Sequence, residues 1–206
     1  MEICIAVCAA LACTGLALVY LYMGKKCKLS GREWLIAAAA CAAAAFAVFR
    51  LEQKGTDVTG MVKILWVLTL MLAAGWVDAR EKIVPNQLIL LGLAGRGLIY
   101  IAELLSDPSG FGMLVLRDLA GTGITVAALL LIVFVSRSAM GFGDVKLLGV
   151  VSLFCGLSWT YSCFLYGLIA AALASVYLLV VKKAGRKYQI AFAPYLLAGY
   201  LITAVL

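Results

Sequence analysis

The sequence has no histidine, only three prolines and few charged residues. The lack of histidine excludes catalytic triads built on histidine and leaves a zinc site with few ligands. Charged residues make up 13% of the 206 positions and hydrophobic residues 66%, against about 25% and about 45–50% in soluble domains. This balance excludes a soluble globular domain, a disordered chain and a disulfide-stapled secreted domain. We therefore expect an all-α, polytopic transmembrane helix bundle.

The sequence also lacks a Cys-x-x-Cys pair, a Walker loop and a glycine-rich dinucleotide motif. Six of its seven cysteines lie inside apolar runs, where cysteine behaves as a small hydrophobic residue. The net charge of +7 comes from Lys and Arg between the apolar runs, which is a topology signal of membrane proteins. We expect a lipid bilayer as the environment, and no metal, cofactor or nucleic acid.

Apolar runs separated by polar segments predict about eight transmembrane helices. The 35 uncharged residues 147–181 would form a helix of about 52 Å, longer than a hydrocarbon layer of about 30 Å, so we expect a turn at 156–158. Residues 1–60 would form an N-terminal transmembrane helical pair, and 61–206 a second unit. The expected helices cover residues 3–23, 34–49, 61–77, 86–105, 118–135, 144–156, 159–181 and 189–206.

The positions of Lys and Arg predict the orientation of these helices. With the N-terminus outside the cytoplasm, twelve of the seventeen basic residues lie in cytoplasmic loops and four on the opposite side. We therefore expect both chain ends outside the cytoplasm.

Two aspartates stand at helix ends: Asp78 closes the third expected helix and Asp144 opens the sixth. Because two crossings separate them, both are expected at the same membrane face. Asp144 could instead be an ordinary helix N-cap, and Asp78 a solvated interfacial charge paired with Arg80 or Lys82. Ionisable groups at a membrane boundary are costly, which favours a functional role. If the two carboxylates meet, they would share one proton and could hydrolyse an amide as base and acid.

Small and polar residues accompany the two aspartates. Gly141 and Gly143 lack side chains, so backbone or substrate can approach Asp144 closely, and they allow positive φ. Lys146 could orient or tune Asp144, or could extend to the membrane interface.

Three further positions carry structural expectations. Pro85 and Asn86 are expected to end a loop and begin the fourth helix, and Pro194 to kink the last helix. Arg96, inside the fourth helix, could bind the backbone or a carboxylate of the substrate. It could instead snorkel or satisfy a neighbouring acid inside the bundle, and we prefer this second interpretation.

These residues resemble a known family. Gly141-Phe142-Gly143-Asp144 is the G-x-G-D motif of membrane aspartyl proteases, and Lys146 completes the G-x-G-D-x-K form of type IV prepilin peptidases. Residues 78–86 resemble that family's D-x₅-[ILV]-P-N motif. Residues 190–195 resemble its I-P-F-A-P-[FY] element, with Ala191 in place of the first proline. The resemblance covers about residues 60–200.

The resemblance implies a prepilin-peptidase-like membrane aspartyl protease domain over 61–206, with Asp78 and Asp144 catalytic. Such an enzyme cleaves the short basic leader from type IV prepilin-like precursors at the cytoplasmic face of the cell membrane, and serves a type IV pilus or protein secretion. Gly141, Gly143, Lys146, Pro85, Asn86 and Pro194 would bind substrate or shape the site. The short loop 24–33 lacks the Cys-x-x-Cys insert of bifunctional family members, so methyltransferase activity is not implied.

Two alternatives stay open. Presenilin and signal-peptide-peptidase enzymes share G-x-G-D but carry Tyr-Asp and Pro-Ala-Leu motifs, where this chain has Val77-Asp78 and Ala193-Pro194-Tyr195. A non-enzymatic membrane protein, either a small transporter or an assembly scaffold, is the alternative from another class, although the chain shows no matching halves.

Overall fold

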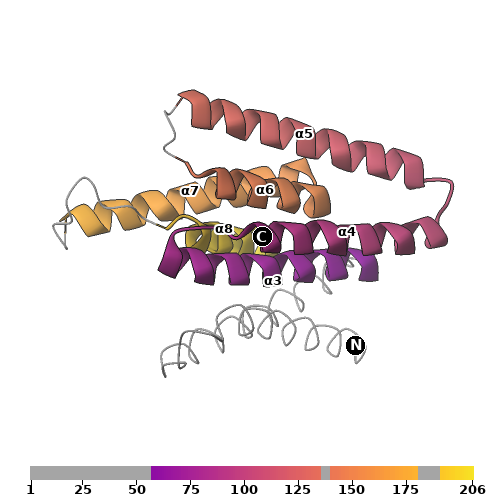
Figure 1. Ribbon diagram of the computed structural model, residues 1–206, viewed down its shortest axis with the longest axis horizontal. Helices are drawn as coiled ribbons and strands as arrows, with labels where there is room; N and C mark the ends of the chain where they lie inside the picture. Colours follow the sequence, from indigo (N-terminus) through magenta and orange to yellow (C-terminus); the bar gives the residue numbers. More distant parts are fainter. Residues whose placement is uncertain (1–56, 136–139, 181–190) are drawn as a thin grey trace, which may run out of the picture.

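The computed structural model describes residues 57–135, 140–180 and 191–206, and this part of the chain contains helices and no strand. Consecutive helices run in alternating directions along one long axis (Figure 1). The helices expected over 3–23 and 34–49, and with them most of the N-terminal pair, lie outside the described residues. The described helices are α3 (Val58–Glu81), α4 (Asn86–Ser106), α5 (Phe111–Val135), α6 (Phe142–Cys155), α7 (Leu157–Val180) and α8 (Ala193–Val205).

The turns between these helices follow local sequence signals. Gly156 separates α6 from α7 and has a positive φ of 83°, so the expected turn is confirmed. Pro85 precedes α4 in an extended conformation and α4 begins at Asn86, as expected. Two boundaries were wrong: α3 continues about one turn beyond Asp78, and α5 begins at Phe111 rather than at residue 118.

Four of the described helices, α3, α4, α5 and α7, are long and apolar enough to cross a membrane. The other two are shorter: α6 has 14 residues and α8 has 13, or about 20 Å each against the roughly 30 Å of a hydrocarbon layer. The chain is therefore a polytopic helical membrane protein, but the expected count of eight crossings is not supported.

The two short helices pack against several of the longer ones. α8 packs against α3 and α7, and α6 contacts α3, α4, α5 and α7. Every residue of α6 from Leu147 to Phe154 is buried, which is the pattern of a helix surrounded by others. By contrast, α4, α5 and α7 expose many large apolar side chains, among them Leu98, Phe134 and Leu173. We assign these outer faces to lipid contact.

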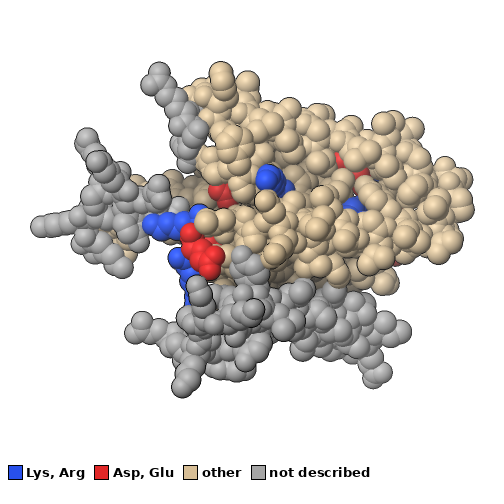
Figure 2. Space-filling view, viewed as in Figure 1, with Lys and Arg blue, Asp and Glu red and all other residues tan. Residues whose placement is uncertain are grey.

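The alternation of directions brings distant segments to one end of the bundle, on the left in Figure 1. This end, called the site end below, holds the end of α3 and the starts of α4, α6 and α8. In Figure 2, charged side chains on the visible face gather mainly toward the site end, and much of the remaining surface is uncharged. Exposed charged residues here include Arg80, Glu81, Lys82 and Lys146.

Candidate active site

Asp78 lies in the last turn of α3 and is buried, with only 6% of its surface exposed. Its Oδ2 accepts a hydrogen bond of 2.9 Å from the backbone N–H of Ala193, the first residue of α8. The interpretation of Asp78 as a solvated interfacial charge is therefore wrong. Burial is tolerated because the carboxylate has a backbone donor 115 positions away in the chain.

Asp144 lies in the first turn of α6 and is 8% exposed. The N-cap of α6 is Gly141, and no side chain caps the helix, so the interpretation of Asp144 as the N-cap is wrong. Its Oδ1 is buried without a hydrogen-bond partner. The carboxylates of Asp144 and Asp78 are close enough to interact electrostatically. Two buried acids from α3 and α6 thus share the site end of the bundle.

Both glycines beside Asp144 make close contacts, and at Gly143 these contacts leave no room for a side chain. A Cβ on Gly143 would come within 2.9 Å of the Cβ of Val84, in the α3–α4 loop, and real Cβ atoms do not approach so closely. A Cβ on Gly141 would lie 3.3 Å from Oδ2 of Asp144. Neither glycine has a positive φ, so their conformational freedom is not used. Their small size lets the loop after Asp78 pack against the start of α6.

Lys146 and Asn86 connect the starts of α6 and α4. The Nζ of Lys146 donates a hydrogen bond of 3.0 Å to Oδ1 of Asn86, and both residues are exposed. The neighbouring Pro85 is buried. Lys146 therefore contacts the segment where α3 turns into α4. This segment follows Asp78 in the chain and contains Val84.

Pro194 begins α8 instead of kinking it, so the expected kink is wrong. It is the second residue of the helix, where its missing N–H would have no partner inside the helix in any case. The start of α8 packs against α3 at Gly75, where a Cβ would lie 3.5 Å from the Cα of Pro194, an ordinary contact distance. Gly75 is about one turn before Asp78, so this contact brings the Ala193 amide to the carboxylate.

The arrangement provides two acids and no preformed metal centre. Across the described ranges, no three His, Cys, Asp or Glu side chains are grouped so that they could hold a metal ion. The geometry provides a pair of carboxylates at the end of an apolar bundle, and the carboxylate of Asp78 accepts a hydrogen bond from the backbone amide of Ala193.

Residues 64–179, more than half of the chain and including both aspartates, match the type IV leader peptidase family. The chain belongs to this family. Membership implies a peptidase in a membrane helical protein and agrees with the resemblance drawn from the sequence motifs. No curated protein and no solved structure matches the chain. The family match ends before α8, so it does not include the Ala193–Pro194 segment.

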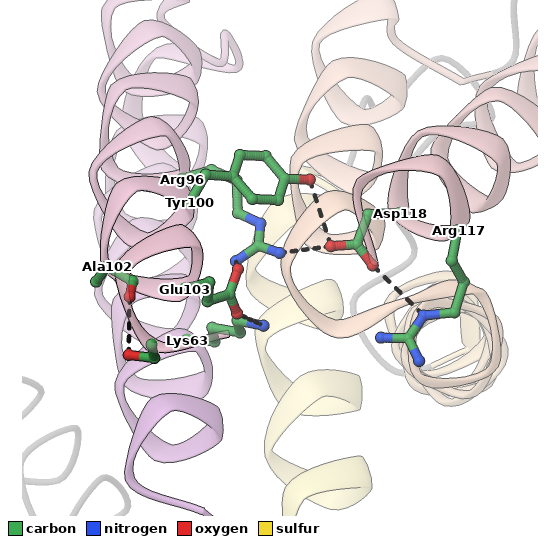
Figure 3. Close-up of polar contacts among 8 residues, drawn as sticks. Lys63, Arg96, Tyr100, Ala102, Glu103, Arg117 and Asp118 are labelled. Atoms are coloured by element: carbon green, nitrogen blue, oxygen red, sulfur yellow. Dashed lines mark hydrogen bonds and ion pairs between the residues drawn. The ribbon is translucent and has the colours of Figure 1, made fainter. Parts of the chain in front are cut away.

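A second polar cluster is formed by side chains of α3, α4 and α5 (Figure 3). Arg96, the eleventh residue of the 21-residue α4, is fully buried and forms an ion pair with Asp118 of α5. Its Nη1 lies 3.2 Å from Oε2 of Glu103, whose other oxygen pairs with Lys63 of α3. The guanidinium also stacks over the ring of Tyr100, 3.9 Å from its centroid.

This cluster decides the role of Arg96. The arginine satisfies acids within the bundle, as the preferred interpretation held, and it joins α4 to α5 and, through Glu103, to α3. Asp118 was not predicted as a partner of Arg96, because the fifth helix was expected to begin at that residue. A start at Phe111 would have put Asp118 inside an apolar helix, where a buried acid demands a partner.

Proposed function

We propose that this chain is an aspartic endopeptidase that cleaves the short basic leader of type IV prepilin-like precursors at the cytoplasmic face of the cell membrane. The observation that carries the proposal is the pair of buried, electrostatically interacting carboxylates of Asp78 and Asp144. They stand at one end of the bundle, in a chain of the type IV leader peptidase family.

The proposed chemistry uses the two acids in complementary states. Two like charges in a poorly solvated site repel each other, so the pair holds one proton in its active state. The ionised carboxylate takes a proton from water, and the resulting nucleophile attacks the scissile carbonyl. The protonated carboxylic acid donates a hydrogen bond to the carbonyl oxygen and neutralises the charge that develops there. The C–N bond then breaks as the leaving amine receives a proton from the pair, which returns to its state with one proton, and both products depart.

The location of the pair suits a substrate with two different halves. A prepilin-like precursor has a basic leader among the lipid headgroups and an apolar helix in the bilayer. The site end carries exposed charged residues such as Arg80 and Lys82, whereas the sides of α4, α5 and α7 are apolar. Cleavage at this boundary would separate the leader from the helix. The basic residues of the adjoining loops support a cytoplasmic location for this end.

The proposal is tested with Asp78→Asn and Asp144→Asn in membranes that contain the full chain and a prepilin-like substrate. The prepilin-like substrate in this assay is a synthetic peptide with a short lysine-containing leader and an apolar helix. We expect each variant to lose about 10²- to 10⁴-fold in cleavage rate. The matched control is Asp107→Asn in the α4–α5 loop, because Asp107 is exposed and its carboxylate accepts hydrogen bonds from nearby Ser109 and Gly110.

The same experiment separates the alternatives. A transporter or scaffold would show no cleavage by the wild-type chain. Processing at near wild-type rates by either active-site variant, with normal expression, would refute the aspartic mechanism. A presenilin-like protease would cleave within the apolar helix, so mass spectrometry of the products distinguishes it from a leader peptidase.

A further inference from the structure

We infer that the backbone amide of Ala193, at the start of α8, is a positioning group that holds the Asp78 carboxylate in its reactive orientation. The inference rests on the proposed function. The amide is the group that the structure places within hydrogen-bond distance of the Asp78 side chain, at 2.9 Å from Oδ2. It would act through Asp78 and would not itself touch the peptide that is cleaved.

The position of Ala193 in its helix makes this amide available. As the first residue of α8, Ala193 has an N–H that no carbonyl of its own helix can accept. Pro194, the next residue, has no N–H, so the helix start directs one isolated donor at Asp78. Ala193 is also fully buried, and water therefore does not compete for this donor. A hydrogen bond to a carboxylate in such surroundings is stronger than one between neutral groups.

Two further contacts hold α8 in the register that this bond requires. Gly75, about one turn before Asp78, leaves room for Pro194 to approach α3. Further along, the hydroxyl of Tyr200 donates a hydrogen bond of 2.7 Å to the carbonyl of Ile64 in α3. α8 is therefore attached to α3 at two levels, and only the level at Ala193 involves a reacting group.

The contact has a consequence for catalysis. Asp78 must be held at the correct angle both to its partner Asp144 and to the attacking water, and misplacement by about 1 Å can cost about 10²-fold in rate. The Ala193 amide restrains the torsion of the carboxylate from the side of α8. Loss of this bond should therefore lower kcat and leave KM, which reflects binding of the leader and the apolar helix, nearly unchanged.

The sharpest test replaces the amide of residue 193 with an ester, by introducing lactic acid at this position in the full chain. This change removes the N–H and keeps the methyl side chain. We expect kcat for the synthetic prepilin-like peptide to fall about 10- to 100-fold, with KM within about twofold of wild type. The matched control is the same ester at Ala204, a buried alanine inside α8 that is remote from Asp78. Its kcat should remain near the wild-type value.

A second pair of variants tests the same contact without backbone chemistry. Gly75→Ala adds a methyl group at an ordinary contact distance and should be tolerated, whereas Gly75→Leu must push the start of α8 away from α3. We expect kcat to fall in the leucine variant and to persist in the alanine variant. If the ester at residue 193 prevents folding, this pair of variants decides whether the contact between Ala193 and Asp78 affects kcat.

The outcomes are distinguishable. No cleavage by the wild-type chain would refute the proposed function itself. If the wild-type chain cleaves, an unchanged kcat in the 193 ester, or an equal fall in the 204 ester, would refute the role of the Ala193 amide. A rise in KM at constant kcat would assign α8 to substrate binding instead and would likewise overturn the inference.

Discussion

Replacing Arg96 with methionine should destabilise the helix bundle by about 3–5 kcal/mol, the cost of breaking a buried ion pair from one side. The buried cluster contains two cations, Lys63 and Arg96, and two acids, Glu103 and Asp118, so its net charge is zero. Methionine retains the unbranched apolar part of the side chain but leaves two carboxylates with one cation. The cluster would then carry a net charge of −1 in the middle of the bundle.

The expected magnitude separates this interaction from an ordinary polar contact between membrane helices. Interhelical hydrogen bonds in membranes contribute about 0.6 kcal/mol on average, because the separated helices find other partners. An uncompensated buried charge costs several times more. The double variant Arg96→Met with Asp118→Leu restores neutrality, since Lys63 and Glu103 remain paired. It should therefore lose less stability than the sum of the two single variants.

The assay is reversible unfolding in mixed detergent micelles, followed by circular dichroism, for the wild type, both single variants and the double variant. Arg117→Met is the control, because the side chain of Arg117 is 77% exposed although it adjoins Asp118. It should unfold like the wild type. A cost below about 1 kcal/mol for Arg96→Met, or strictly additive costs in the double variant, would contradict the electrostatic argument.

Three further predictions concern the site end. The rate of cleavage should show a bell-shaped dependence on pH, because the mechanism needs one ionised and one protonated carboxyl group in the pair of Asp78 and Asp144. Acid would protonate both groups and remove the base, and alkali would ionise both and remove the acid. A monotonic profile would exclude this pair. Gly143→Ala should destabilise the fold by about 1–3 kcal/mol and reduce cleavage, because the new Cβ would meet Val84. Adding Val84→Ala to this variant should partly restore stability in an unfolding assay and cleavage in an activity assay. Lys146→Met and Asn86→Ala should each reduce kcat several-fold, and the double variant should reduce it no further, because both changes remove the same hydrogen bond. Additive losses would show that the two residues have separate roles.

Local signals in the sequence were sufficient for much of the fold. The apolar runs predicted the six described helices, and Gly156 and Pro85 marked their turns, because these residues act on the backbone where they stand. The placement of Asp78 and Asp144 at one end needed only the presence of two helices between them. Helix lengths were less accurate: Asp78 is inside α3, and α5 starts seven residues earlier than expected. A buried acid such as Asp78 or Asp118 does not end a helix when a tertiary contact satisfies it.

By itself, the sequence determined that this protein is an apolar helical bundle. It also determined that Asp78 and Asp144, each part of a sequence motif, lie at the same end of that bundle. The tertiary structure alone decided what each charged group contacts: Asp78 accepts a hydrogen bond from Ala193, Arg96 pairs with Asp118, and Lys146 bonds to Asn86. The physical reason is that helices apolar on nearly every side carry little information about their rotation. Only their packing selects which side chains and amides face one another.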